Sequence, residues 1–69
     1  MIVLDFLGRR CPLPVIGLAR RMPGVAVGDV VRVLADDPAA ANDIAAWCRM
    51  KGQQFMGADG ETIDVRRIS

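Results

Sequence analysis

Residues 29–38 read D-V-V-R-V-L-A-D-D-P, and in these ten residues a strand pattern runs directly into a helix start. Residues 29–35 are rich in valine and alternate between apolar and polar positions, which predicts a strand. A strand with one apolar face needs a second layer to cover it, so we expect helices on that side of the sheet. The apolar face consists of Val31, Val33 and Ala35.

Asp36, Asp37 and Pro38 predict the start of a helix. An aspartate side chain can cap free backbone N–H groups there, and proline suits the first helical position. We expect the helix to run to about Lys51 and to end at Gly52. Adjacent aspartates could also form a pair of catalytic carboxylates, but the proline that follows them favours capping. The stripe expected to face the core is Ala41, Ile44, Ala45 and Cys48, with Trp47 beside it.

Another strand and helix precede this stretch. Branched and aromatic residues fill positions 2–6 and Gly8 follows, which predicts a strand and a tight connection. Pro12 opens a helix that covers residues 13–22, and Pro23-Gly24 stops it. The apolar positions of this helix are Val15, Leu18, Ala19 and Met22, and its other side carries Gly17, Arg20 and Arg21.

A hairpin closes the chain. Residues 54–58 and 61–68 flank Asp59-Gly60, a pair suited to the positive backbone angles of a two-residue turn. Ile63 and Val65 are expected to face inward, and Thr62, Asp64 and Arg66 outward. The element order is β-α-β-α-β-β, and right-handed crossovers would place both helices on the same face. We therefore expect an α+β fold, a two-layer sandwich of one small mixed four-stranded sheet with two helices on one face, in a single domain over residues 1–69.

The composition limits the classes of function. The 69 residues are 52% hydrophobic and 25% charged, with a net charge of +1, so no strong field would attract nucleic acid or an anionic membrane. The longest apolar runs are far shorter than the roughly 20 residues that span a bilayer, and we expect neither a signal peptide nor membrane insertion. Two cysteines are few for a secreted fold of this size, so we expect a reducing, cytoplasmic setting.

Cys11 is the candidate for chemistry. It stands where the first strand's exit loop becomes a helix, where partial positive charge together with Arg9 and Arg10 favours the thiolate. The chain has no histidine for a Cys-His pair, no Cys-x-x-Cys motif and too few cysteines for a structural zinc site, so we expect no metal and no cofactor. Pro12 and Pro14 fix the backbone of the helix start but remove two N–H donors. The residues thus indicate a rigidly held, exposed thiol that can attack another sulfur.

The motif Cys11-Pro12-Leu13-Pro14 resembles that of the TusA-like (SirA-like) family of small sulfur carriers, in which Cys-Pro-x-Pro begins the first helix. The resemblance extends to L-D-F-L-G before the motif, V-G-D-V-V-R-V-L-A-D-D-P-A-A in the middle and D-I-A-A-W-C-R-M-K-G in the second helix. The chain departs from the family at three positions that concern partner choice, Arg9, Gly17 and Gln53. Leu13 also differs from the glutamate that some tRNA-thiolation members have at that position.

This resemblance implies that Cys11 carries sulfur as a persulfide. The donor would be a cysteine desulfurase or a rhodanese-like protein, and the acceptor another protein in tRNA thiolation, molybdenum cofactor assembly or sulfur oxidation. Gly8, Pro12 and Pro14 would support the motif. The alternatives are a non-catalytic interaction or regulatory module and a redox-sensing thiol.

The other candidate residues have two readings each. Cys48 lies in the apolar stripe of its helix, so we expect a core role instead of a second reactive thiol. Trp47 and Met50 could offer a partner surface or flank the core. Four arginines would either form a docking patch for partner proteins or simply lie exposed to solvent: Arg9, Arg10, Arg20 and Arg21.

Overall fold

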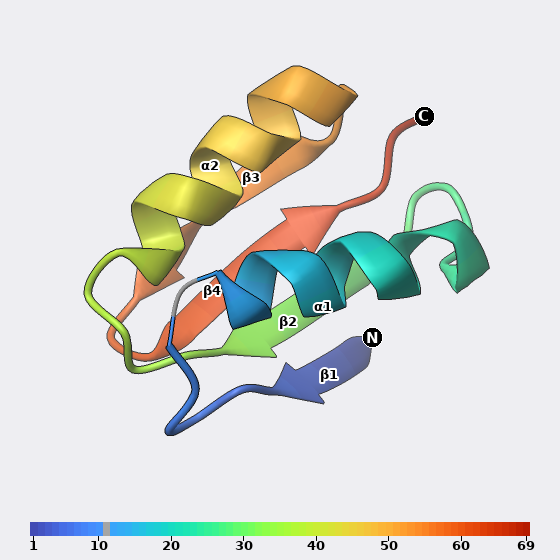
Figure 1. Ribbon diagram of the computed structural model, residues 1–69. Helices are drawn as coiled ribbons and strands as arrows, with labels where there is room; N and C mark the ends of the chain where they lie inside the picture. Colours follow the sequence, from blue (N-terminus) through green and yellow to red (C-terminus); the bar gives the residue numbers. More distant parts are fainter. Residues whose placement is uncertain (11) are drawn as a thin grey trace.

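The structure is a computed structural model that describes residues 1–10 and 12–69. Its elements are β1 (Ile2–Asp5), α1 (Leu13–Arg21), a 3-10 turn η1 (Met22–Gly24), β2 (Val30–Leu34), α2 (Ala40–Lys51), β3 (Gln54–Asp59) and β4 (Thr62–Arg66). Both helices cover the same face of the sheet (Figure 1). The predicted element order and the two-layer architecture are confirmed.

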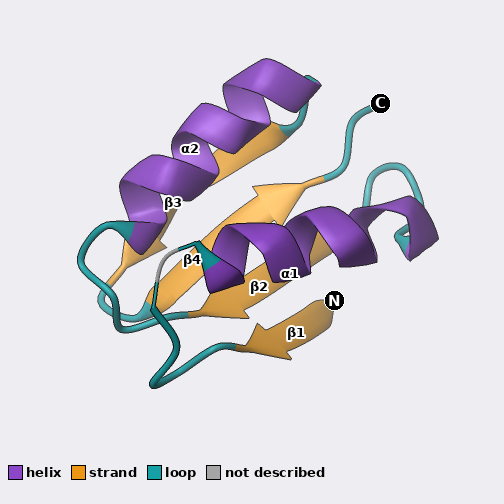
Figure 2. Ribbon diagram, in the orientation of Figure 1, coloured by secondary structure: helices purple, strands orange, loops and turns teal. Residues whose placement is uncertain are grey.

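The four strands form one mixed sheet in the order β1-β2-β4-β3 (Figure 2). β1 pairs parallel with β2, and β4 pairs antiparallel with both β2 and β3. A parallel pair needs a long crossover connection, which α1 supplies, whereas the antiparallel β3 and β4 need only a tight turn. The two central strands, β2 and β4, therefore lie under the helices and carry most of the strand contribution to the core.

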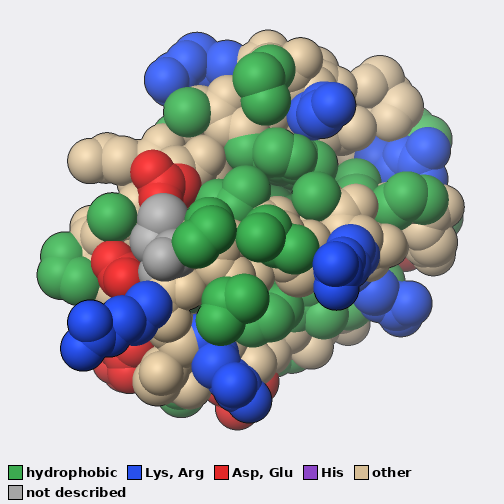
Figure 3. Space-filling model, in the orientation of Figure 1, with side chains coloured by type: hydrophobic (Ala, Val, Ile, Leu, Met, Phe, Trp, Pro, Cys, Tyr) green, Lys and Arg blue, Asp and Glu red, His purple; other side chains and the backbone are tan. Residues whose placement is uncertain are grey.

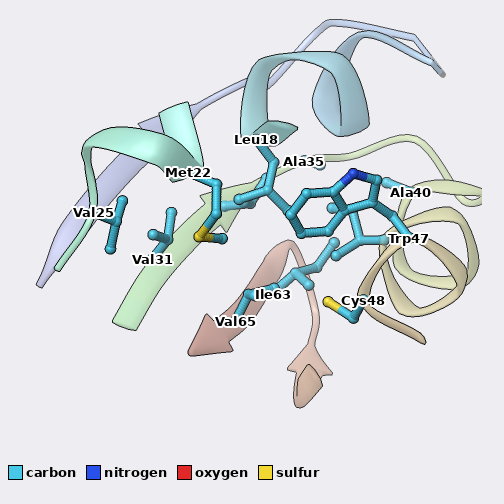
Figure 4. Packing of buried hydrophobic residues seen from close by; sticks show 12 residues of the cluster. Leu18, Met22, Val25, Val31, Ala35, Ala40, Trp47, Cys48, Ile63 and Val65 are labelled. Carbon is cyan, nitrogen blue, oxygen red and sulfur yellow. The ribbon is translucent and has the colours of Figure 1, made fainter. Parts of the chain in front are cut away.

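The core lies between the sheet and the two helices (Figure 4). The strand residues predicted to face inward are all buried, as the alternation of side chains along a strand requires: Val31, Val33, Ile63 and Val65. Ala35 is buried as well, and its N–H donates to the Glu61 carbonyl at 2.9 Å just beyond the end of β2. The remaining buried hydrophobic side chains come from the helices and their connections: Leu18, Met22, Val25, Ala40, Ile44, Trp47 and Cys48.

Helix α2 differs from its prediction at its start and in its buried face. It begins at Ala40, because Asp37 caps the preceding turn instead: its carboxylate accepts the Ala39 N–H at 2.8 Å. Ile44 and Cys48 are buried as predicted, but Ala41 and Ala45 are only partly buried. The helix packs against α1 as well as on the sheet, so Trp47 is 8% exposed and belongs to the core. Gly52 ends the helix with φ +74°, as predicted.

The ends of the other elements also shift. β1 ends at Asp5, although the Phe6 N–H still donates to the Leu34 carbonyl at 2.8 Å. Met22 lies in the 3-10 turn after α1 instead of in the helix. The hairpin turn is Gly60-Glu61, one residue later than predicted, because Asp59 still pairs with Thr62 and Gly60 takes the positive φ of +60°.

The last strand is shorter than predicted because the tail turns toward the end of α2. β4 ends at Arg66, and the Ile68 N–H donates to the side-chain oxygen of Gln53 at 2.8 Å. The side-chain N–H of Gln53 donates to the Ser69 carbonyl at 3.2 Å. Gln53 thus holds the C-terminal tail beside the end of α2.

Candidate functional site

The candidate site lies at the edge of the sheet where β1 and β2 both end. These strands run parallel, with Asp5 beside Leu34, so the segments that follow them leave the sheet side by side. Open α/β sheets bind ligands at this carboxyl edge. Cys11 itself falls outside the described residues, between Arg10 and Pro12. Its neighbours on both sides define the site.

Backbone hydrogen bonds hold the segment before Cys11. The Leu7 N–H donates to the Asp5 carboxylate at 3.0 Å, and the Arg9 N–H donates to the Phe6 carbonyl at 3.0 Å. Gly8, between them, has a φ of +77°, a conformation that residues with a side chain rarely adopt. The predicted tight connection at Gly8 is therefore confirmed.

The residues after Cys11 are held as the first turn of α1. The Leu13 N–H donates to the Arg10 carbonyl at 2.9 Å, and the Ile16 N–H donates to the Pro12 carbonyl at 3.0 Å. Pro12 is exposed at the N-cap position, where no side-chain hydrogen bond caps the helix. Pro14 is fully buried. Pro14 therefore anchors the motif in the core, a role beyond the backbone restriction expected from sequence.

Asp36 connects the two neighbouring segments, which sequence reasoning missed. We expected this side chain to cap the helix that follows it, but its two carboxylate oxygens accept the Gly8 N–H at 3.0 and 3.1 Å. The capping prediction holds for the turn at Asp37 and is wrong for Asp36. The contact joins residues 28 positions apart, so no local sequence pattern could reveal it.

Hollows lie beside the segments on both sides of Cys11. One, of about 270 Å³ between α1 and α2, is largely apolar and is lined by Pro12 and Trp47 among others. Two others are lined by arginines. One, of about 410 Å³, lies between the segments after β1 and β2 and is lined by Gly8, Arg9, Arg10, Asp36, Asp37 and Pro38. The other, of about 240 Å³, lies between β1 and α1 and is lined by apolar residues, two arginines and one aspartate: Asp5, Phe6, Arg9, Leu13, Ile16, Gly17 and Arg20.

The four arginines do not form one patch. Arg9 lines both of the arginine-lined hollows, while Arg10 lines the larger of them and Arg20 the smaller. Arg21 ends α1, at the opposite end of the helix from the motif, with its guanidinium beside Gly24. The structure therefore brings Arg9, Arg10 and Arg20 to the surroundings of the motif and leaves Arg21 apart.

Exposed apolar side chains accompany these arginines. Leu13 is 47% exposed and Ile16 is 39% exposed on α1, and Met50 on α2 is also exposed. Figure 3 shows hydrophobic side chains gathered over the helices with lysine and arginine side chains around them. Such a surface, apolar at its centre and charged at its rim, is typical of a protein-protein contact.

Gly17 lies against Phe6 instead of facing solvent as predicted. A Cβ atom on Gly17 would be 2.0 Å from the Cζ atom of Phe6. The ring therefore takes the space that a side chain at position 17 would need. Phe6 and Gly17 together shape one wall of the hollow between β1 and α1.

Cys48 is a buried free thiol, as the sequence predicts. It is 1% exposed on α2, and desolvation by burial raises the pKa of its thiol. A raised pKa leaves less thiolate at neutral pH and makes this thiol a poor nucleophile. Cys48 contributes to packing in the core (Figure 4).

Residues 1–10 and 12–69 contain no group of three or more histidine, cysteine, aspartate and glutamate side chains arranged to hold a metal ion. None of the helices in these ranges is long and apolar enough to cross a membrane.

Comparisons with known proteins identify the family. A family model described as "Sulfurtransferase TusA" matches residues 2–67. The chain is 33% identical over 60 residues to the "Putative sulfur carrier protein YrkF" of Bacillus subtilis (strain 168), a match that covers 87% of this chain and 32% of that protein. The chain thus spans about a third of the length of this curated relative.

A solved structure agrees with this match. The crystal structure of the SirA-like protein from Desulfitobacterium hafniense superimposes with a TM-score of 0.73 at 31% identity, covering 94% of this chain and 92% of that chain. The same four-stranded mixed sheet with two helices supports the fold. With the family model matched over nearly the whole chain, the protein belongs to the TusA sulfurtransferase family.

Proposed function

We propose that this protein is a sulfur carrier that accepts sulfane sulfur on Cys11 as a persulfide and passes it to a partner protein. The observation that carries the proposal is the motif Cys11-Pro12-Leu13-Pro14 in a chain of the TusA family. Residues on both sides of Cys11 are held by hydrogen bonds, and Pro14 is anchored in the core. A carrier thiol benefits from this support, because transfer needs the sulfur at a fixed position.

The transfer step is a thiol exchange with no net oxidation. The Cys11 thiolate attacks the outer sulfur of a donor persulfide, a new S–S bond forms on Cys11, and the donor's S–S bond breaks to release its thiolate. The helix start and the neighbouring Arg9 and Arg10 favour the thiolate. In the second half-reaction an acceptor thiolate attacks the outer sulfur now on Cys11, and Cys11 leaves as a thiolate.

The partners would be proteins, because a carrier must meet a donor and an acceptor in turn. We propose a cysteine desulfurase or rhodanese-like donor, and a downstream protein acceptor. Arg9, Arg10 and Arg20 with the exposed Leu13 and Ile16 supply a docking surface for them. Exchange between free thiols requires a reducing compartment, so we place the protein in the cytoplasm.

Mass spectrometry of the intact protein tests this function. The Cys48→Ala protein, with Cys11 as its single thiol, is incubated with inorganic polysulfide and measured with and without reductant. A gain of one sulfur atom that reductant removes supports the carrier. Oxygen addition without sulfur would indicate a redox-sensing thiol, and an unchanged mass would favour an interaction module; either result contradicts the proposal.

A further inference from the structure

Asp36 reaches from the segment after β2 to the segment that leads to Cys11. Its carboxylate oxygens Oδ2 and Oδ1 lie 3.0 and 3.1 Å from the backbone nitrogen of Gly8, three residues before Cys11. A hydrogen bond to a charged carboxylate is about twice as strong as one between neutral groups. The contact therefore ties together two segments that are 28 positions apart in the sequence.

The contact acts where the backbone needs support. Gly8 has a φ of +77°, and glycine is the residue with the most backbone freedom to lose. The bonds from Leu7 to Asp5 and from Arg9 to Phe6 are local, so they keep the shape of the segment without fixing it on the sheet. The bonds of Phe6 to Leu34 and of Gly8 to Asp36 connect it to the β2 side.

The position of Asp36 follows from the topology. β1 and β2 are parallel neighbours, so the residue just after the buried Ala35 leaves the sheet beside the exit from β1. Asp36 lines a hollow together with Gly8, Arg9 and Arg10. Its side chain is thus directed to the motif segment and makes no capping bond to α2.

We propose that Asp36 is the positioning residue for Cys11, holding the segment before the motif so that the sulfur meets a partner's sulfur in a fixed place. This inference rests on the proposed function. A misplacement of about 1 Å can slow a reaction by about 100-fold, because the two reacting atoms must approach within a narrow range of distance and angle. A small donor can adapt to a displaced thiol, whereas a docked protein donor cannot.

The test uses three variants in the Cys48→Ala background. Asp36→Ala removes the acceptor, Asp36→Asn keeps an acceptor oxygen without the charge, and Asp29→Ala removes the same charge at the far end of β2 as a matched control. Three quantities are measured: amide hydrogen exchange at Gly8, sulfur loading by inorganic polysulfide, and single-turnover transfer from a rhodanese-type sulfurtransferase loaded with thiosulfate. Urea unfolding of each variant is the folding check.

Asp36→Ala should increase exchange at Gly8 and slow transfer from the protein donor at saturation by about tenfold, while the donor concentration for half-maximal rate stays the same. Loading by polysulfide should change by less than about twofold, and Asp36→Asn should stay within about threefold of the parent. A purely structural role would lower loading and transfer alike. If Asp36→Ala does not fold, Asp36→Ser, whose hydroxyl stops one atom short of the carboxylate oxygens, takes its place.

Besides an equal loss of loading and transfer, two results would overturn the inference. One is transfer by Asp36→Ala at the parent rate; the other is an equal loss in Asp36→Ala and Asp36→Asn, which would assign the effect to charge instead of the hydrogen bond to Gly8. Failure of the proposed function is distinguishable, because the parent itself would then take up no sulfur while its Gly8 amide remained protected.

Discussion

The ring of Phe6 takes the place of a side chain at Gly17: a Cβ atom built on Gly17 would be 2.0 Å from Cζ and 2.5 Å from Cε1 of that ring. The segment leaving β1 therefore packs directly on the backbone of α1. Because the motif lies between these two residues in the sequence, their contact holds together the two ends of the segment that carries Cys11. Only glycine permits so close an approach.

Gly17→Ala should lower the free energy of unfolding. Overpacking costs about 1 to 3 kcal/mol, and this exceeds the gain of at most about 1 kcal/mol when alanine replaces glycine in a helix. Urea unfolding measures the change, and Gly24→Ala is the matched control because its Cβ would meet only Arg21, at an ordinary 3.6 Å. A Gly17→Ala protein as stable as the parent would contradict the packing.

Cys48→Ala should leave sulfur loading intact and destabilise the fold by about 1 kcal/mol, since it trims a buried apolar position. The raised pKa of the Cys48 thiol adds a chemical expectation: in the folded parent, iodoacetamide near neutral pH should modify one thiol quickly and the Cys48 thiol only on unfolding. Peptide mapping after timed alkylation checks this. Loss of loading in a folded Cys48→Ala protein would instead indicate a relay between the two thiols.

The ion pair on the open face of the sheet predicts a pH dependence. Arg32 Nε and Nη2 donate to the Asp64 carboxylate at 2.9 and 3.0 Å, and this hydrogen bonding lowers the pKa of Asp64. A lowered pKa in the folded state stabilises the fold above the unfolded-state pKa, and this contribution is lost as the pH falls through the folded pKa. The stability difference between the parent and Asp64→Asn should be constant near neutral pH and shrink below about pH 4. Urea unfolding across the acid range measures it, and a difference independent of pH would rule out the pair as its source.

Charge reversal at Arg9 and Arg10 together should slow transfer from a protein donor more than loading by polysulfide. Both side chains line the hollow beside the motif, and protein docking depends on complementary charge. Reversal of Arg21 and Arg49 together, in the last turns of α1 and α2, changes the net charge by the same amount and should have the smaller effect. Parallel single-turnover assays with the two kinds of donor give the comparison. Equal losses with both donors would mean that Arg9 and Arg10 act on the sulfur itself.

Local sequence patterns predicted the helices and strands and the side of each that is buried. They did not predict the contacts between segments that are distant in the sequence. The alternation through Val31 and Val33 and the end of the helix at Gly52 are local properties, and both predictions are confirmed. The bond from Gly8 to Asp36 depends on which strands become neighbours, and periodicity carries no such information. Trp47 is buried because α2 packs on α1 as well as on the sheet, and a single apolar stripe describes only one of these contacts.

The same distinction applies to the candidate site. Local sequence placed Gly8 in a tight connection and Pro12 at a helix start, and both agree with the structure. The four arginines looked equivalent in the sequence, but Arg20 and Arg21 leave the last turn of α1 in different directions, and of these two only Arg20 lines the hollow between β1 and α1. The role of Cys11 stays a prediction, since it falls outside the described residues.

Sulfur transfer by a Cys11→Ser variant is the decisive measurement for the carrier role of Cys11. Serine can occupy the start of a helix at least as well as cysteine, so the fold and the affinity for partners should survive the change. Its hydroxyl is barely ionised near neutral pH and forms no stable persulfide, so sulfur uptake and delivery should both be lost. The measurement follows isotopically labelled sulfur from donor to acceptor through the variant, with circular dichroism on the same sample. We predict a folded protein that carries no label, and a folded Cys11→Ser protein that delivers label at the parent rate would show that Cys11 is not the carrier.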